Sequence, residues 1–218
     1  MRCTILVSIS AWMMVTGVAI AGGQPTTVLV EPAAQSAAAQ AFQAFGGLTG
    51  QRPVGVPAAD KMNKAALGDP LVVNMVRLDE LQNYQFAPAT DPAALLHDLQ
   101  TLVYPIHVAG KPNGEMVMRK VDGAWSVRGF AGPAHVQAVE NVSAQLAKAG
   151  VPAGSTMLVR VPAMGIEFVA FRDAAGLKLT PVADFAAGGL IAGQTLPASR
   201  VFAQLSPLAV QQQPGLVD

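Results

Sequence analysis

The spacing of apolar positions predicts four helices. One is expected at 33–45, where alanine and phenylalanine share one face between a proline and a Gly-Gly pair. The clearest is expected at 133–149, because valine and leucine recur there every three or four residues. Shorter helices are expected at 92–100, after an Asp-Pro start, and at 197–205, before a Ser-Pro pair that could kink or end the helix.

Alternating and β-branched runs predict a set of strands joined by short turns. The expected strands are at 71–78, 102–108, 115–121, 124–130, 156–161, 165–173 and 176–182. No hydrophobic period survives at 46–70, where glycine and proline recur, so we expect a long loop or linker there. The pattern is typical of an α+β fold, with an antiparallel sheet of hairpins and helices packed on one face.

The order of these elements suggests how the chain is organised. Three strands and a helix occur twice, at 102–150 and 155–206, which allows two similar βββα halves that arose by duplication. We expect a signal peptide at 1–21 and an N-terminal helix with its Gly/Pro-rich linker at 22–70. A single α+β domain is expected at 71–210. A flexible tail is expected at 211–218.

The N-terminus has the pattern of a secretory signal. Arg2 precedes an apolar run that ends in the small-x-small pattern Ala19-Ile20-Ala21, which signal peptidase recognises. The alternative is an uncleaved anchor, but the cleavage pattern favours removal. Cys3 lies before the apolar run rather than after it, so a lipid anchor is not expected. We therefore expect a periplasmic or secreted bacterial protein with no stable membrane span after cleavage.

The composition narrows the function classes. Hydrophobic residues make up 51% of the chain and charged residues only 13%. Without Arg2 the chain would hold 13 basic and 14 acidic residues, so it lacks the basic excess of a nucleic-acid-binding protein. The mature chain would contain no cysteine, because the single one is Cys3. Thiol catalysis, disulfides, cysteine zinc sites and iron–sulfur clusters are therefore not expected.

The sequence contains no recognisable catalytic or metal-binding motif. His97, His107 and His135 show no metal-ligand spacing, and no GxSxG, P-loop or GxGxxG pattern is present. His97 is placed beside an aspartate in the helix expected at 92–100, where neighbours diverge by about 100°. His135 is placed in the first turn of a helix, where the dipole favours its neutral form. We assign no catalytic, cofactor-binding or metal residue.

The stretch 117–130 concentrates charge and one of the two tryptophans. A two-residue Asp-Gly turn fixes the register, so that Lys120 faces Trp125 and its stem can lie along the ring. Trp125 then lies on an apolar face and is expected to pack on the helix at 133–149. Arg119 and Arg128 lie on the other face, where they form a candidate surface for an anionic ligand or a partner. A diagonal contact with Glu115 could neutralise part of that charge.

These observations favour a non-catalytic binding protein. The leading hypothesis is an envelope protein that binds another envelope component, for example by adding a strand to a sheet edge. One alternative is a small exported hydrolase with a dispersed acid or histidine site. The other is a carrier for an apolar small ligand, bound between sheet and helices. No cofactor and no nucleic-acid partner are expected.

Overall fold

The computed structural model describes residues 30–47, 52–85 and 91–212. Within these ranges, four α-helices and four short 3₁₀ helices surround one nine-stranded sheet. The α-helices are α1 (Pro32–Gly46), α2 (Leu78–Gln82), α3 (Pro133–Lys148) and α4 (Ala198–Gln211). The 3₁₀ helices are Ala59–Lys64, Pro92–Leu95, Pro162–Met164 and Ala186–Gly188. The strands are β1 (Ala65–Leu67), β2 (Leu71–Met75), β3 (His97–Val108), β4 (Lys111–Val121), β5 (Ala124–Ala131), β6 (Met157–Val161), β7 (Ile166–Asp173), β8 (Gly176–Pro181) and β9 (Leu196–Pro197).

The sheet consists of two meanders joined by a central strand. Its order is β5-β4-β3-β2-β6-β7-β8-β9, and β1 pairs with β3 beyond the part of β3 that β2 covers. Neighbouring strands are antiparallel except β2 and β6, which run parallel. The short strand β2 therefore connects the β3-β4-β5 meander to the β6-β7-β8 meander. The predicted α+β fold with a largely antiparallel sheet is confirmed.

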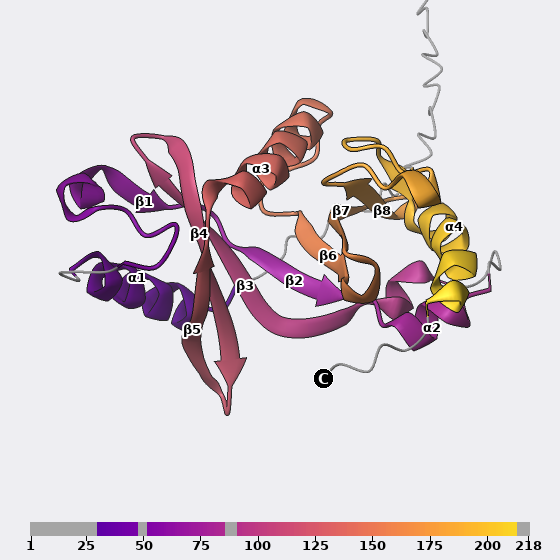
Figure 1. Ribbon diagram of the computed structural model, residues 1–218, viewed down its shortest axis with the longest axis horizontal. Helices are drawn as coiled ribbons and strands as arrows, with labels where there is room; N and C mark the ends of the chain where they lie inside the picture. The colour runs from indigo at the N-terminus through magenta and orange to yellow at the C-terminus, as the bar shows by residue number, and fades with distance from the viewer. Residues whose placement is uncertain (1–29, 48–51, 86–90, 213–218) are drawn as a thin grey trace, which may run out of the picture.

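Helices cover both faces of this sheet. In Figure 1, α3 lies over its middle, while α1 and α4 lie toward its two ends. Side chains alternate between the faces along each strand: Phe168 packs in a cluster with α4, whereas Val169 packs in a cluster with α3. On β3, Tyr104 likewise packs with α1, and Val103 packs with α3. The sequence pattern predicted helices on one face only, whereas the structure has helices on both faces.

The helix α3 is held on the sheet by its apolar stripe. Val139, Val142 and Leu146 are buried against side chains of β2, β3, β6 and β7. The helix begins at Pro133, whose fixed φ suits a first helical position, and it ends at Lys148, before Gly150. This matches the prediction for 133–149. Since α3 crosses several strands, its polar side chains meet residues from distant parts of the chain.

Several predicted boundaries are wrong for identifiable reasons. The region 46–70 is not one loop, because the 3₁₀ helix Ala59–Lys64 and β1 occupy its second half. With only three residues, β1 is too short to show a hydrophobic period. The predicted strand 71–78 ends at Met75, and α2 follows it.

The predicted helix at 92–100 is also wrong beyond its first turn. Asp91 does cap this turn by accepting a hydrogen bond from the Ala93 amide, but only the 3₁₀ helix follows. His97 then begins β3 and pairs with Met75 of β2, so tertiary pairing overrides the helical signal.

The helix α4, by contrast, is longer than predicted and continues to Gln211 with Pro207 inside it. Its buried stripe continues past the proline, which keeps the helix intact.

The β4–β5 hairpin has the predicted Asp-Gly turn and register, with Lys120 opposite Trp125. The Lys120 ammonium lies 6.0 Å from the centre of the Trp125 ring, as expected from their pairing. The predicted packing of Trp125 on α3 is wrong, because its ring belongs to the cluster around α1. The indole also donates a hydrogen bond of 3.1 Å to Glu31, the residue before α1. This hairpin therefore holds α1 against the sheet.

Some predictions fall on residues outside the described ranges. These are the signal peptide at 1–21, with Ala19 and Ala21, and the tail from residue 213 onward. The residues 211 and 212, placed in the tail by the sequence, close and follow α4. The division into halves at 102–150 and 155–206 stays a prediction. Within the described ranges, no helix is both long enough and apolar enough to cross a membrane.

Candidate functional site

All three histidines of the chain are paired with glutamates. His97 of β3 contacts Glu80 of α2, and His107 of β3 contacts Glu140 of α3. His135 of α3 contacts two glutamates, one on β4 and one on β7. The partners lie 17, 33, 20 and 32 residues apart in the sequence, so no local motif could reveal them.

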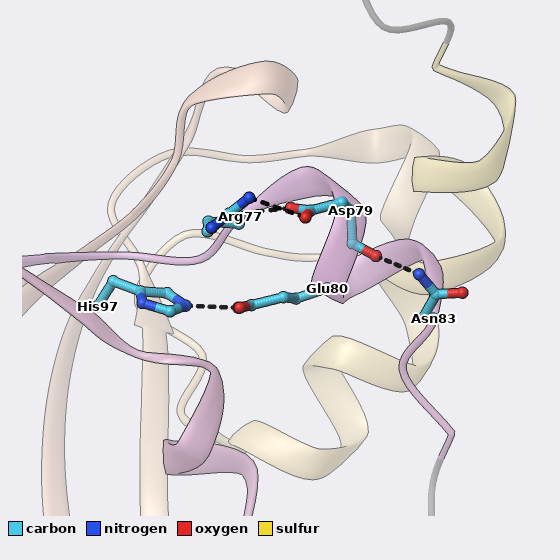
Figure 2. Close-up of polar contacts among 5 residues, drawn as sticks. All are labelled: Arg77, Asp79, Glu80, Asn83 and His97. Carbon is cyan, nitrogen blue, oxygen red and sulfur yellow. Dashed lines mark hydrogen bonds and ion pairs between the residues drawn. The ribbon is translucent and has the colours of Figure 1, made fainter.

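The His97–Glu80 pair lies at the surface. Figure 2 shows the His97 ring extending from β3 toward α2, where its Nε2 donates to Glu80 at 2.6 Å. Beside it, Arg77 forms an exposed ion pair with Asp79, and the Asn83 amide donates to the Asp79 carbonyl (Figure 2). The His97 and Glu80 side chains are 38% and 35% exposed. Exposed pairs of this kind contribute little to stability, so we interpret this group as surface contacts of α2 and do not place the functional site there.

His135 forms the centre of an ionic network of four side chains. Its Nδ1 donates to Glu115 of β4 at 2.7 Å, and its Nε2 donates to Glu167 of β7. Glu167 also accepts a hydrogen bond of 2.6 Å from Arg160 of β6. Glu115 is only 5% exposed, so its carboxylate is almost entirely removed from water. Two cations and two carboxylates thus meet at the start of α3, and their charges balance.

The electrostatics of this network overturn the prediction of a neutral His135. Hydrogen bonds to Glu115 and then to Glu167 raise the pKa of His135 to about 10, against the opposing effect of burial. Burial also acts on Glu167, but His135 and Arg160 outweigh it and hold the pKa of Glu167 below its ordinary value. The helix dipole, which favours neutral imidazole, is weaker than two adjacent carboxylates. His135 is therefore a cation at neutral pH.

The His107–Glu140 pair is open on one side. His107 Nε2 donates to Glu140 Oε1 at 2.5 Å, and the two side chains are 24% and 30% exposed. Gly68 leaves room for the ring, because a Cβ there would lie 2.9 Å from His107 Cε1. A register shift between Ile106 and His107 lies beside this position on β3. The pair therefore occupies a place built by β3, α3 and the segment before β2.

A cavity of about 460 Å³ lies directly against this pair. Its walls are α3, the end of β3, the segment 68–71 and the segment 151–156. Most of the lining is apolar, including Leu71, Pro105 and Val139. The volume falls in the range of small-molecule sites, which are mainly apolar with a few polar groups. The His135 network also borders a cavity, of about 360 Å³, but there both ring nitrogens of the histidine are held by carboxylates.

The cavity does not contain an assembled nucleophile. Ser143 lies one turn after Glu140 and lines the cavity, but within the described structure no hydrogen bond joins it to His107. The His107 Nε2 is directed to Glu140, whereas a serine nucleophile needs a base within hydrogen-bond reach. Among the residues that the structure describes, no group of three or more histidine, cysteine or acidic side chains could hold a metal ion. The cavity offers the partly exposed side chains of His107 and Glu140 for polar contacts.

The predicted surface residues Arg119 and Arg128 lie apart from this cavity. Both are exposed on the β4–β5 hairpin, and no ion pair joins either to another residue of the described ranges. The register shifts between Val117 and Met118, which displaces Arg128 from the regular ladder. The predicted contact with Glu115 is wrong, because Glu115 binds His135 instead. The arginines remain a candidate interaction surface.

Comparison with known proteins finds no matching family model, no similar curated protein and no similar solved structure. No residue role can therefore be transferred to this chain. The candidate site depends on its geometry alone: a cavity, an apolar lining and one open ionic pair.

Proposed function

We propose that the protein is an exported binding protein for a small, mainly apolar molecule. The observation that carries the proposal is the cavity of about 460 Å³ beside His107 and Glu140. Apolar walls stabilise a bound ligand by removing its surface from water, and a few polar groups fix its orientation. Export is proposed from the N-terminal sequence, which ends its apolar run at Ala21.

Binding is favoured over catalysis because the polar groups at the cavity are paired with one another. His107 Nε2 is directed to Glu140, and Ser143 is not connected to the pair. The more strongly perturbed group, His135, is held on both ring nitrogens by carboxylates. A general base needs to reach a proton of the substrate, and a cation locked between two carboxylates cannot serve in that role.

A fluorescent neutral probe tests the binding proposal. N-phenyl-1-naphthylamine should bind the mature protein with saturable fluorescence enhancement. Ala144→Trp should abolish this signal, because Ala144 lines the cavity. Ala203→Trp is the matched control, since Ala203 is an exposed alanine of α4 that lines none of the described cavities. Absence of saturable binding, or equal binding by Ala144→Trp, would contradict the proposal.

The export proposal has its own test. Cell fractionation followed by N-terminal sequencing should find the mature chain outside the cytoplasm, beginning at Gly22. Recovery of the full-length chain in the cytoplasm would contradict it. Replacement of Ala19 and Ala21 by a bulky residue such as leucine should block processing, because signal peptidase requires small residues at these positions.

A second candidate function is the binding of an acidic envelope protein at the β4–β5 hairpin. It is favoured by the exposed Arg119 and Arg128 and by the position of β5 at the end of the sheet. A strand at a sheet edge can pair with an added strand, and arginines can bind its acidic side chains. Envelope proteins captured by the wild type should be lost with Arg119→Ala/Arg128→Ala. Equal capture by both would exclude this surface.

A further inference from the structure

Negative charge predominates among the side chains that line the cavity. Asp69 and Glu140 line it, together with His107, while its lining contains no lysine or arginine. Glu140 uses Oε1 toward His107, and its side chain is 30% exposed. Asp69 is exposed, and no ion pair joins it to any residue that the structure describes. Even with His107 protonated, the lining holds more negative than positive charge.

Apart from Asp69, His107, Glu140, Ser143 and Thr156, the lining consists of glycine, alanine, proline, valine and leucine. Pro70, Leu71 and Pro105 approach the cavity from the sheet side, and Leu146 and Val151 approach it from α3 and the following segment. A molecule that fits this lining needs an apolar body and one polar end. The charge at that end should complement carboxylates, because a second anion beside Asp69 and Glu140 would be repelled.

We propose, resting on the proposed function above, that the ligand is an amphiphilic amine. Its apolar chain lies against the aliphatic lining, and its protonated ammonium group binds the carboxylates of Glu140 and Asp69. An ammonium group has three donors and no acceptor, which suits two carboxylates that accept hydrogen bonds only. Hydrogen bonds in which both partners are charged are shorter and stronger than neutral ones. The ammonium group thus supplies the selectivity, and the apolar chain supplies contact area.

Three probes of equal chain length separate charge from apolar contact: octylamine, octanol and octanoate. Each is titrated at neutral pH against the mature protein with bound N-phenyl-1-naphthylamine, and displacement is measured. We expect octylamine to displace the probe at a concentration about tenfold lower than octanol, since hydrogen bonds between charged groups have about this effect. Octanoate should displace it more weakly than octanol.

Two variants assign the effect to residues. Glu140→Gln and Asp69→Asn should each weaken octylamine binding about tenfold relative to octanol binding by the same variant. The Asp69 side chain is exposed, so Asp69→Asn keeps the test valid if Glu140→Gln fails to fold. Glu80→Gln is the matched control, because Glu80 pairs with His97 and does not line this cavity. Its octylamine binding should equal that of the wild type.

The possible failures are distinguishable. Equal displacement by octanol or octanoate would overturn the amine proposal while the cavity remained a binding site. Unchanged octylamine binding in both Glu140→Gln and Asp69→Asn would also overturn it. If neither the naphthylamine nor any octyl compound binds, the proposed function itself fails.

Discussion

The helix α3 carries two ionic sites that differ in how completely their carboxylates are buried. At its start, His135 is held by two carboxylates, and one of these is also held by Arg160. Five residues later, Glu140 has the single partner His107 and lies against a cavity. Histidine and glutamate therefore form part of a network of four charged side chains at the first site and a single pair at the second.

This difference suggests different roles. Removing a charge from water is costly, and His135 offsets the cost for Glu115, which is 5% exposed. The network also joins β4, β6 and β7 at the start of α3, so we interpret it as structural. The Glu140 side chain is 30% exposed, whereas those of Glu115 and Glu167 are 6% and 16% exposed, so the carboxylate of the His107–Glu140 pair is the more accessible to a ligand.

The largest expected effect on stability comes from breaking the network around His135. His135→Ala should lower the free energy of unfolding by about 3 kcal/mol, because it leaves Glu115 buried without its partner. His107→Ala should cost about 1 kcal/mol, since its partner stays partly hydrated. Urea denaturation of both variants and the wild type measures the difference. Equal losses of unfolding free energy in the two variants would show that burial of the carboxylate does not distinguish the two sites.

The pH dependence of protein stability should reveal the contribution of the same network. The pKa of His135 is raised from 6.5 to about 10 on folding, so the folded protein binds its proton more tightly than the unfolded chain. Its stabilisation is complete below about pH 6.5 and is lost as pH rises toward 10, at a cost of about 2 kcal/mol after solvent screening.

Urea denaturation from pH 6 to pH 10 measures this loss. The control is His135→Gln, which cannot titrate and should lack this part of the pH dependence, while other groups still contribute. A wild-type curve parallel to that of His135→Gln would show that His135 is not held as a cation.

A smaller effect is expected from disturbing the open pair. In Gly68→Ala the new Cβ would lie 2.9 Å from His107 Cε1, so the ring must shift away from its present position. We expect a loss of about 1 kcal/mol in stability and severalfold weaker probe binding. Gly129→Ala is the matched control, because a Cβ there meets nothing within 4 Å. Probe binding that survives Gly68→Ala unchanged would separate His107 from the ligand site.

The smallest effect is expected at the hairpin surface. Arg119→Ala/Arg128→Ala should change stability by less than about 0.5 kcal/mol, since both side chains are exposed and away from the core. Thermal unfolding of the double variant measures this. A larger loss would mean that these arginines support the fold and are a poor choice for testing a partner surface.

The sequence predicted local features well where the pattern was long. The stripe of α3 and the Asp-Gly turn of the β4–β5 hairpin depend on neighbouring residues, and both were correctly predicted. His97 was misplaced in a helix because its pairing with Met75 is a tertiary contact. The four histidine–glutamate contacts were missed for the same reason. Each joins residues on separate elements, and their spacing has no motif.

The central strand β2 has a consequence for how the chain folds. Each meander forms from neighbouring hairpins, but β2 and β6 must meet over a long separation: Asn74 and Met157, whose side chains contact, are 83 residues apart. Closing such a loop costs entropy before any contact is gained, so we expect the β2–β6 pair to form after the two meanders. Pulsed hydrogen exchange during refolding should protect β4 and β7 before β6 pairs with β2. The joint between the meanders would then be the slow step of assembly.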